Sequence, residues 1–371
     1  MIWECSKCKR RWYYPVEMCI FCRSELNEIT PSKFTVKGIT EVHIPSSEHD
    51  IVPYYELILE DDFGNFYVRK SFRNFQIGDT ISQDLKVPFC VTAKDQTRIG
   101  VIGTGLMGKQ LAQFLAEAGY HVVLCSRTKE RANDALNKIE KGLSKNRDPQ
   151  AVKSILNKIE ASVDLEKLHE VDLIIETIVE DLDKKRQLLS DISSICSENA
   201  IIATNTSSLP ISELASSFAY PERVIGMHFF NPVAKMQLVE VVYGRTTSKE
   251  TIESIMNFTE GLGKRPIMVK DTPGFIVNRS LMPFINEAAS LLQEDVSPND
   301  IDEAIKLGLN HPMGPLGLAD LIGLDICVSI MNTLYQRFKD VRYIPSPIFN
   351  ELISKGYLGK KTGKGFYDYG H

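Results

Sequence analysis

The chain contains 371 residues, of which 43% are hydrophobic and 25% are charged, and its formal net charge is −5. This composition is that of a folded protein of roughly two to four domains, and the negative charge disfavours a chain that binds nucleic acid as a whole. No apolar run reaches the ~20 residues of a membrane-spanning helix, and the first residues lack the features of a signal peptide, so we expect a cytoplasmic protein.

Four of the eight cysteines form two Cys-x-x-Cys pairs that are ten residues apart. Two such turns can close a tetrahedral metal site, and four thiolates leave no open position for catalysis. We therefore predict a structural zinc ribbon over residues 1–31, with iron or a redox pair as the alternatives. The predicted ligands are Cys5, Cys8, Cys19 and Cys22. The other cysteines are scattered singly, which is typical of buried apolar residues in a reducing compartment.

Residues 32–92 contain several short stretches with the pattern of strands and no helical period. We predict a small β-barrel of OB type, with strands at residues 34–39, 55–60, 66–69 and 77–81. Zinc ribbon and OB fold together resemble small modules associated with acyl-CoA enzymes, which implies contact with acyl-CoA or with a partner such as a thiolase. The basic and aromatic residues at 3–14 also fit a solvated rim around the metal, which we favour, or base stacking.

A dinucleotide-binding pattern starts at residue 98. A buried strand at 98–102 precedes a Gly-x-Gly-x-x-Gly turn, a helix at about 107–118 and a second strand at 121–125. This context indicates a Rossmann domain, which we place at residues 97–273. The glycines allow a tight turn and close approach of a pyrophosphate, and the helix start offers free amides to it. The predicted phosphate-binding residues are Gly103, Gly105, Leu106, Met107 and Gly108.

The end of the second strand carries Ser126 and Arg127, where an acidic residue usually binds the free ribose hydroxyl of NAD. Without that carboxylate a 2′-phosphate is not repelled, and an arginine can pair with it. We therefore predict a preference for NADP(H) over NAD(H), the alternative being that Arg127 is only a solvated residue at a helix start. Residues 130–169 are charged and have a helical pattern.

Ligands bind at the carboxyl ends of strands in open α/β sheets. Glu180 and Lys185 follow the apolar strand at 171–176, and Asn205 follows the strand at 200–204. We predict that these three residues lie on the cofactor side of the site. Ser207 comes next, and either it or Ser208 could instead cap a helix.

A histidine and a carboxylate twelve residues apart provide a proton carrier. Oxidation of a secondary alcohol needs a base for the hydroxyl proton, and a histidine titrates near neutral pH. We predict that His228 is this base, that Glu240 orients it, and that Ser207 and Asn278 donate to the substrate oxygen. The alternatives are a histidine packed in the core and two helix caps.

The segments 205–209, 226–232, 238–241, 271–279 and 359–367 resemble the L-3-hydroxyacyl-CoA dehydrogenase family from residue 97 to the end of the chain. The resemblance places the family's catalytic residues on Ser207, His228, Glu240 and Asn278, and its cofactor-side pair on Glu180 and Lys185. It implies a homodimer that interconverts 3-hydroxybutyryl-CoA and acetoacetyl-CoA. The helical period after residue 274 predicts an all-α domain over 274–371. A dehydrogenase for a non-thioester hydroxyacid, or a scaffold binding acyl-CoA or nucleic acid, are the alternatives.

Overall fold

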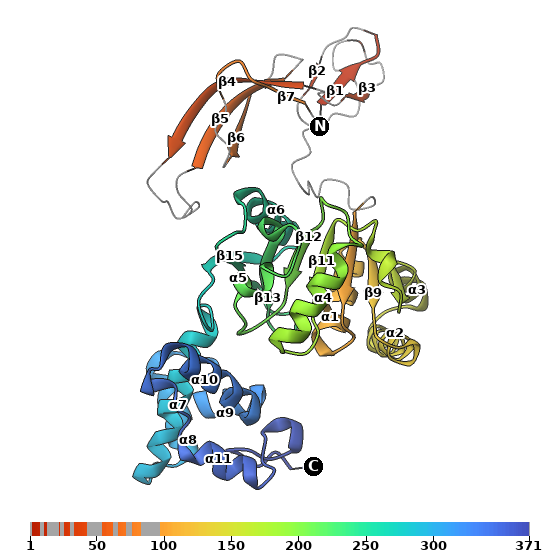
Figure 1. Ribbon diagram of the computed structural model, residues 1–371. Helices are drawn as coiled ribbons and strands as arrows, with labels where there is room; N and C mark the ends of the chain where they lie inside the picture. The colour runs from red at the N-terminus through yellow and green to blue at the C-terminus, as the bar shows by residue number, and fades with distance from the viewer. Residues whose placement is uncertain are drawn as a thin grey trace. The chain divides into compact units, whose positions relative to one another are not determined.

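The computed structural model describes residues 2–7, 11–12, 22, 26–29, 33–42, 54–61, 66–71, 76–82 and 97–370. The chain forms two compact units, Met1–Val87 and Pro88–His371 (Figure 1).

The first unit contains two antiparallel sheets. The three-stranded sheet has the order β2-β1-β3, and the four-stranded sheet has the order β6-β5-β4-β7. Their strands are β1 Ile2–Cys5, β2 Arg11–Trp12, β3 Leu26–Ile29, β4 Lys33–Val42, β5 Tyr54–Asp61, β6 Phe66–Ser71 and β7 Thr80–Ser82. The strands predicted at 34–39, 55–60 and 66–69 fall within β4, β5 and β6. The strand predicted at 77–81 begins too early, because residues 77–78 form a turn and only residues 80–81 lie in β7. Val36, Leu57 and Leu59 form a small core on the four-stranded sheet.

The predicted zinc site falls partly outside the described residues, because Cys8 and Cys19 are not among them. In the part of the chain that the structure describes, no group of three or more histidine, cysteine or acidic residues could bind a metal ion. The zinc ribbon and the closed barrel therefore stay predictions. Of the scattered cysteines, Cys125, Cys196 and Cys327 are buried, as predicted, and Cys90 lies outside the described residues.

The second unit contains an eight-stranded sheet of order β10-β9-β8-β11-β12-β13-β14-β15. The first six strands are parallel in the Rossmann order, and β14 then pairs antiparallel with β13. The strand bounds are β8 Arg98–Ile102, β9 His121–Cys125, β10 Ile159–Ser162, β11 Leu173–Glu176, β12 Ile201–Thr204, β13 Val224–Phe229, β14 Leu238–Tyr243 and β15 Arg265–Lys270. The strand order reverses between β8 and β11, which is where open α/β sheets form their ligand crevice.

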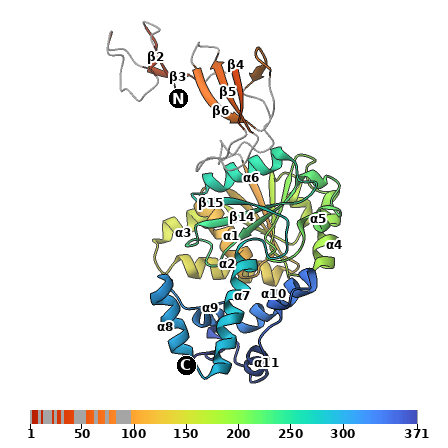
Figure 2. The same cartoon turned by 90° about the vertical axis from the view of Figure 1, so that its left-hand side faces the viewer.

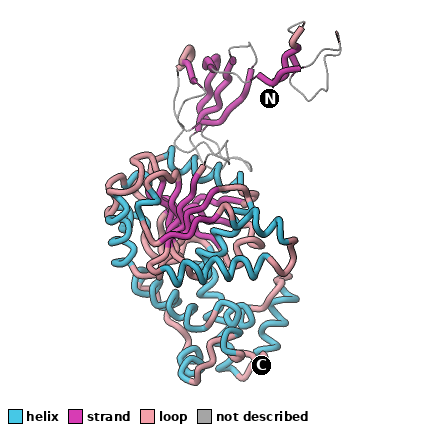
Figure 3. Tube along the Cα trace, turned by 90° about the vertical axis from the view of Figure 1, so that its right-hand side faces the viewer, coloured by secondary structure: helices cyan, strands magenta, loops and turns pink. Residues whose placement is uncertain are grey.

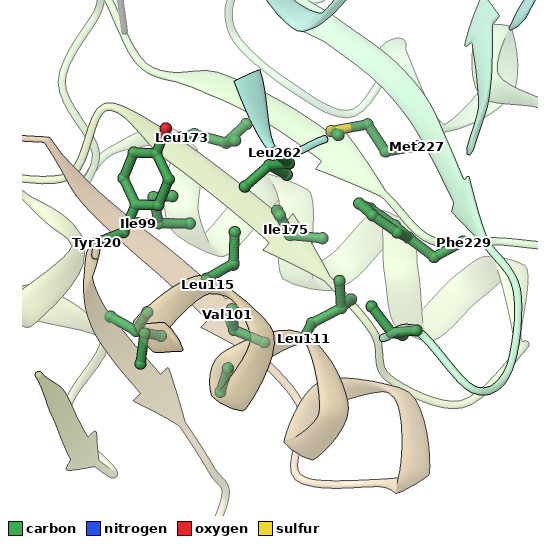
Figure 4. Close-up of a cluster of buried hydrophobic side chains, with 14 of the residues drawn as sticks. Ile99, Val101, Leu111, Leu115, Tyr120, Leu173, Ile175, Met227, Phe229 and Leu262 are labelled. Atoms are coloured by element: carbon green, nitrogen blue, oxygen red, sulfur yellow. The ribbon is translucent and has the colours of Figure 1, made fainter. Parts of the chain in front are cut away.

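Helices cover both faces of this sheet (Figure 3). They are α1 Leu106–Glu117, α2 Lys129–Leu143, α3 Pro149–Leu156, α4 Leu182–Ser193, α5 Ile211–Ala215 and α6 Lys249–Gly261. Successive side chains of a strand point to opposite faces, so Leu173 and Ile175 join the cluster with α1 and α6, while Ile174 joins the cluster with α4 and α5. Leu111 and Leu115 of α1 pack in the first cluster (Figure 4).

The helical prediction for residues 130–169 was wrong at its end. α2 and α3 form there, but residues 159–162 are the edge strand β10, which pairs with β9. An edge strand of four residues with one buried side chain, Ile159, has no alternation long enough to distinguish it from the end of a helix.

The C-terminal part of the second unit is all-helical, as predicted (Figure 2). Its helices are α7 Val277–Ser290, α8 Pro298–Leu309, α9 Pro315–Ile322, α10 Leu324–Phe338 and α11 Pro347–Ser354. They pack around a core that includes Met282, Leu316 and Met331. Proline occupies the first turn of α8, α9 and α11, where its missing N–H has no intrahelical partner to lose.

A buried aspartate, Asp320, fixes the end of the chain on this domain. It accepts hydrogen bonds from the amides of Phe366 and Tyr367 and from the hydroxyl of Tyr369. Gly365 leaves the room for this contact, because a Cβ there would lie 1.9 Å from Oδ1 of Asp320.

Within the described residues, no single helix is long and apolar enough to cross a membrane. Only α9 and α10 taken together reach that length, and they meet at a bend of 96°.

Candidate active site

The turn between β8 and α1 has the geometry of a phosphate-binding loop. Gly103 has φ +116°, a conformation that side chains disfavour, and a Cβ on Gly108 would lie 1.9 Å from the carbonyl of Gly103. A Cβ on Gly105 would meet no protein atom within 4 Å. No side chain caps α1 at Gly105, so the amides of its first turn are available to an anion. These residues fit a bound pyrophosphate.

The end of β9 carries no acidic residue. The Ser126 hydroxyl lies 3.3 Å from the hydroxyl of Thr104, and the Arg127 side chain is exposed. Thr128, not Arg127, caps α2 by accepting a hydrogen bond from the amide of Arg131. Arg127 is therefore not used by the helix start and stays accessible beside the phosphate-binding turn.

Strand pairing brings His228 and Glu240 together. They are direct partners in the antiparallel register of β13 and β14, and both are buried. Nδ1 of His228 lies 2.7 Å from Oε2 of Glu240, and Nε2 lies 3.1 Å from Oγ of Ser207. The carboxylate favours the tautomer with the proton on Nδ1, which donates to Glu240. In this tautomer the lone pair of Nε2 is directed at Ser207, as a general base needs. The imidazole packs beside the rings of Phe230 and Phe275.

The second oxygen of Glu240 binds the start of the helical domain. Oε1 accepts hydrogen bonds from the amides of Ile276 (2.9 Å) and Val277 (3.0 Å), where α7 begins. Helix-start amides stabilise a carboxylate charge. The chain reaches this position through Gly274 at φ +75° and Phe275 at φ +53°, and a phenylalanine with positive φ is strained. This contact was not predicted from the sequence, because the pattern of residues gives no sign of the strained turn at Gly274 and Phe275.

Asn278 lies on the first turn of α7 and is buried. Its Nδ2 donates to the backbone carbonyl of Ser207 (3.2 Å). The structure therefore brings together all four predicted catalytic residues from two domains: Ser207, His228, Glu240 and Asn278.

Neither Ser207 nor Ser208 caps a helix. The next helix, α5, has no side-chain cap of its own, and Asp271 instead accepts from the amides of Ile211 (3.0 Å) and Ser212 (2.8 Å). The capping alternative for the two serines is therefore wrong, because a more distant carboxylate occupies the helix start.

Glu180 anchors the loop that carries Ser207. Its Oε1 accepts from Oγ1 of Thr206 (2.6 Å), N of Ser207 (2.9 Å), and N (3.0 Å) and Oγ (3.1 Å) of Ser208. Burial alone would raise the pKa of the Glu180 carboxyl, but the ammonium of Lys185 and these hydrogen bonds outweigh burial and lower it. Glu180 is therefore a carboxylate at neutral pH.

Two further predicted residues lie at the same edge of the sheet. Lys185 is buried, with Nζ 3.5 Å from Oε2 of Glu180. Oδ1 of Asn205 accepts from the amide of Phe229 (2.9 Å), so Asn205 connects the ends of β12 and β13.

The loop after β13 is fixed by two residues that the sequence analysis did not identify. Gln110 of α1 donates to Oδ1 of Asn231 (2.8 Å) and accepts from the amide of Val233 (2.8 Å). The buried Lys264 donates to the carbonyls of Val233 (2.6 Å) and Met236 (2.8 Å). Neither residue stands in a motif, and only the fold shows that they meet this loop.

A Rossmann sheet, a phosphate-binding turn and a buried histidine–glutamate dyad define a dinucleotide-dependent dehydrogenase. Residues 98–272 match the NAD-binding domain of 3-hydroxyacyl-CoA dehydrogenase, and residues 274–369 match its C-terminal domain. The chain therefore belongs to the 3-hydroxyacyl-CoA dehydrogenase family, whose members are oxidoreductases acting on CH–OH groups. The NAD-binding domain supports NAD(H) as a cofactor.

Individual relatives agree with this assignment. The chain is 45% identical over 278 residues to 3-hydroxybutyryl-CoA dehydrogenase of Clostridioides difficile, which covers 73% of this chain and 99% of the relative. It is 39% identical over 317 residues to human mitochondrial hydroxyacyl-coenzyme A dehydrogenase, covering 82% and 99%. The crystal structure of (S)-3-hydroxybutyryl-CoA dehydrogenase from Ralstonia eutropha superimposes with a TM-score of 0.70 at 41% identity, covering 74% and 99%.

Proposed function

We propose that the chain catalyses the reversible oxidation of (S)-3-hydroxyacyl-CoA to 3-oxoacyl-CoA with a nicotinamide dinucleotide, and that its substrates are the short-chain pair 3-hydroxybutyryl-CoA and acetoacetyl-CoA. The observation that carries the proposal is the His228 ring, with Nδ1 on Glu240 at 2.7 Å and Nε2 directed at Ser207. The short-chain relative in Clostridioides difficile supports the choice of substrate.

His228 moves the proton in this proposal. In the oxidation direction Nε2 takes the hydroxyl proton of the substrate, and Glu240 stabilises the imidazolium that forms. When bound, the dinucleotide supplies the acceptor for the hydride that leaves the carbon bearing this hydroxyl. In the reduction direction the imidazolium returns the proton to the substrate oxygen. Burial of the dyad strengthens the stabilisation, because a charge pair interacts more strongly away from water.

Ser207 and Asn278 bind the substrate oxygen in this proposal. The Ser207 hydroxyl is 3.1 Å from Nε2 of His228, so an oxygen that accepts its proton also lies within reach of the ring. The Nδ2 group of Asn278 donates to the Ser207 carbonyl and stands beside the same position. Donors placed where charge develops lower the barrier, and removing one typically costs ~2.7–4 kcal/mol.

The cofactor is bound along the carboxyl edge of the sheet. The proposed contacts are Gly103, Gly105, Leu106, Met107, Gly108, Ser126, Arg127, Glu180 and Asn205. Lys185 was predicted with them, but only 1% of its side chain is exposed, so its role here is to support Glu180 rather than to contact the cofactor. The open space at Gly105 and the exposed Arg127 support a pyrophosphate at the turn and a 2′-phosphate beyond β9. We therefore propose that the enzyme prefers NADP(H), although it also uses NAD(H).

The N-terminal unit is proposed to be a zinc ribbon and OB-type module that docks the enzyme onto a thiolase or another acyl-CoA enzyme. The described strands form two antiparallel sheets, which is compatible with those folds. Co-purification of partners with the full chain and with a variant lacking residues 1–92 tests the docking, and identical partner sets would contradict it.

The helical domain exposes Leu307, Leu309 and Leu321, with 77%, 57% and 53% of their surface accessible, and such apolar surface supports a homodimer.

Spectrophotometry tests the reaction. Acetoacetyl-CoA should oxidise NADPH and NADH in the presence of the enzyme, while free 3-oxo and 2-oxo acids should be turned over far more slowly. His228→Gln should nearly abolish turnover and leave dinucleotide binding intact, since the ring lies outside the phosphate-binding turn. An equal rate with a free 3-oxo acid would contradict the thioester substrate, and a His228→Gln variant with most of its kcat would contradict the proton role.

A further inference from the structure

Glu176 ends strand β11 and is fully buried, although the mechanism above does not use it. Its carboxylate accepts from Nζ of Lys185 with both oxygens, at 2.7 and 2.8 Å. It also accepts from Oγ1 of Thr204 and from the amide of Ile178, both at 2.6 Å. A buried carboxylate is tolerated only when it is paired and hydrogen-bonded in this way.

Lys185 connects Glu176 to Glu180. Only 1% of the Lys185 side chain is exposed, so protein surrounds its ammonium group. Nζ lies within 2.8 Å of both Glu176 oxygens, 3.4 Å from the carbonyl of Ile178 and 3.5 Å from Oε2 of Glu180. The ammonium is therefore bound firmly by Glu176 and placed behind the outer oxygen of Glu180.

Glu180 divides its two oxygens between this lysine and the catalytic loop. Oε2 faces Lys185, while Oε1 accepts the four hydrogen bonds from residues 206–208. Ser207 is the middle residue of that loop, and its hydroxyl lies 3.1 Å from Nε2 of His228. A continuous series of charged and hydrogen-bonded groups therefore runs from Glu176 to the serine beside the catalytic ring.

We propose that Glu176 is a positioning residue for the dehydrogenase reaction: by binding Lys185 it fixes Glu180, and Glu180 fixes the loop that presents Ser207 to His228. The inference rests on the proposed function, because it takes Ser207 as a residue that contacts the substrate oxygen. Without the Glu176 charge, the ammonium of Lys185 has Glu180 as its remaining carboxylate partner. Lys185 is then no longer held in place behind Glu180, so Glu180 loses its fixed position under the loop.

The expected defect is in kcat measured at saturating dinucleotide. Glu180 is itself a proposed cofactor contact, and Thr177, next to Glu176, contacts Gly103 of the phosphate-binding turn, so the dinucleotide Kd is measured alongside to reach saturation. Misplacement of a catalytic group by ~1 Å can cost ~10²-fold in rate. We expect E176Q to lower the kcat of acetoacetyl-CoA reduction by roughly 10²-fold. E170Q serves as the control, because Glu170 pairs with Arg98 at the surface and 72% of its side chain is exposed.

A double-mutant cycle with S207A separates positioning from general damage. If Glu176 acts through Ser207, then E176Q added to S207A should lower kcat by less than about threefold more, because coupled residues are not additive. Equal factors in the two backgrounds, or an E176Q enzyme with parental kcat, would overturn the inference alone. An S207A enzyme with parental kcat would overturn it together with the role of Ser207.

E176Q leaves a buried ammonium with fewer partners, which destabilises the fold, so E176Q/K185M is measured as well. This double variant contains no uncompensated ammonium, and its Tm should return toward that of the parent. Its kcat should stay low, because Glu180 still lacks an ammonium that is held in place behind it. Recovery of kcat together with Tm would show that the pair contributes only to stability and would overturn the positioning role.

Discussion

Replacing Glu240 with glutamine should change which ring nitrogen of His228 carries the proton. Glu240 accepts from three donors: Nδ1 of His228 and the amides of Ile276 and Val277. Glutamine has one acceptor oxygen and one NH₂ group. If its oxygen stays on the two amides, then its NH₂ group faces Nδ1. The ring can accept that hydrogen bond only with its proton on Nε2, and a protonated Nε2 cannot serve as the base.

The magnitude follows from two effects. Loss of the correct tautomer in a carboxylate–histidine dyad costs ~10⁴-fold in kcat in the serine proteases, and we expect roughly 10³–10⁴-fold here. If the glutamine instead turns its oxygen toward His228, the amides of Ile276 and Val277 lose their acceptor. Each unsatisfied buried donor then lowers the free energy of unfolding by about 1–3 kcal/mol. The variant should therefore lose most of its kcat in the first orientation and lose stability in the second.

Single-turnover reduction of acetoacetyl-CoA measures this effect without interference from product release, and a thermal melt measures the stability. E213Q is the matched control, because Glu213 forms only a half-exposed ion pair with Arg337 and such pairs contribute about 0–1 kcal/mol. An E240Q enzyme that has the parental Tm and keeps more than about a tenth of the parental rate, a barrier increase below ~1.4 kcal/mol, would refute the orienting role of Glu240.

Three further outcomes are expected. The kcat/KM for NADPH should exceed that for NADH and should fall toward it in Arg127→Ala, since the arginine pairs with the 2′-phosphate; a clear preference for NADH would contradict this. Gly365→Ala should lower the free energy of unfolding by roughly 2–4 kcal/mol, because its Cβ would overlap Asp320, and an unchanged Tm would contradict it. The purified chain should contain about one zinc per chain by metal analysis, and Cys5→Ser should lose it; a metal-free parent chain would contradict the zinc site.

The sequence predicted the Rossmann and helical domains because their signals are local. The glycine turn, the apolar strands and the three- and four-residue period after residue 274 each occupy one contiguous segment. Edge strand β10 was missed because its four residues carry little pattern of their own, and it is a strand only because β9 pairs with it. A pairing partner 37 residues away, as Val122 is from Ile159, cannot be inferred from a single segment.

The site residues that could be predicted are likewise those with a local signal in the sequence. His228 and Glu240 could be named from their surroundings, since each is polar within an otherwise apolar strand, and the fold then supplied the register that makes them neighbours. Glu176 has the same signature at the end of β11, a charged residue after three buried apolar ones. It was not identified because its importance depends on Lys185 and on the loop at 206–208, which the order of the strands brings to it.

The buried carboxylates Glu240 and Glu176 position different parts of a site that two domains form. Glu240 joins the catalytic ring to the first turn of α7, so the base and the helical domain share one carboxylate. Glu176 acts within the Rossmann sheet, where the ends of β11 and β12 fix the serine loop whatever the position of that domain. Asn278, which comes from α7 and donates to the Ser207 carbonyl, is the point where the two systems meet. Movement of the helical domain should therefore alter His228 and Asn278 together and leave the Glu176–Lys185 pair intact.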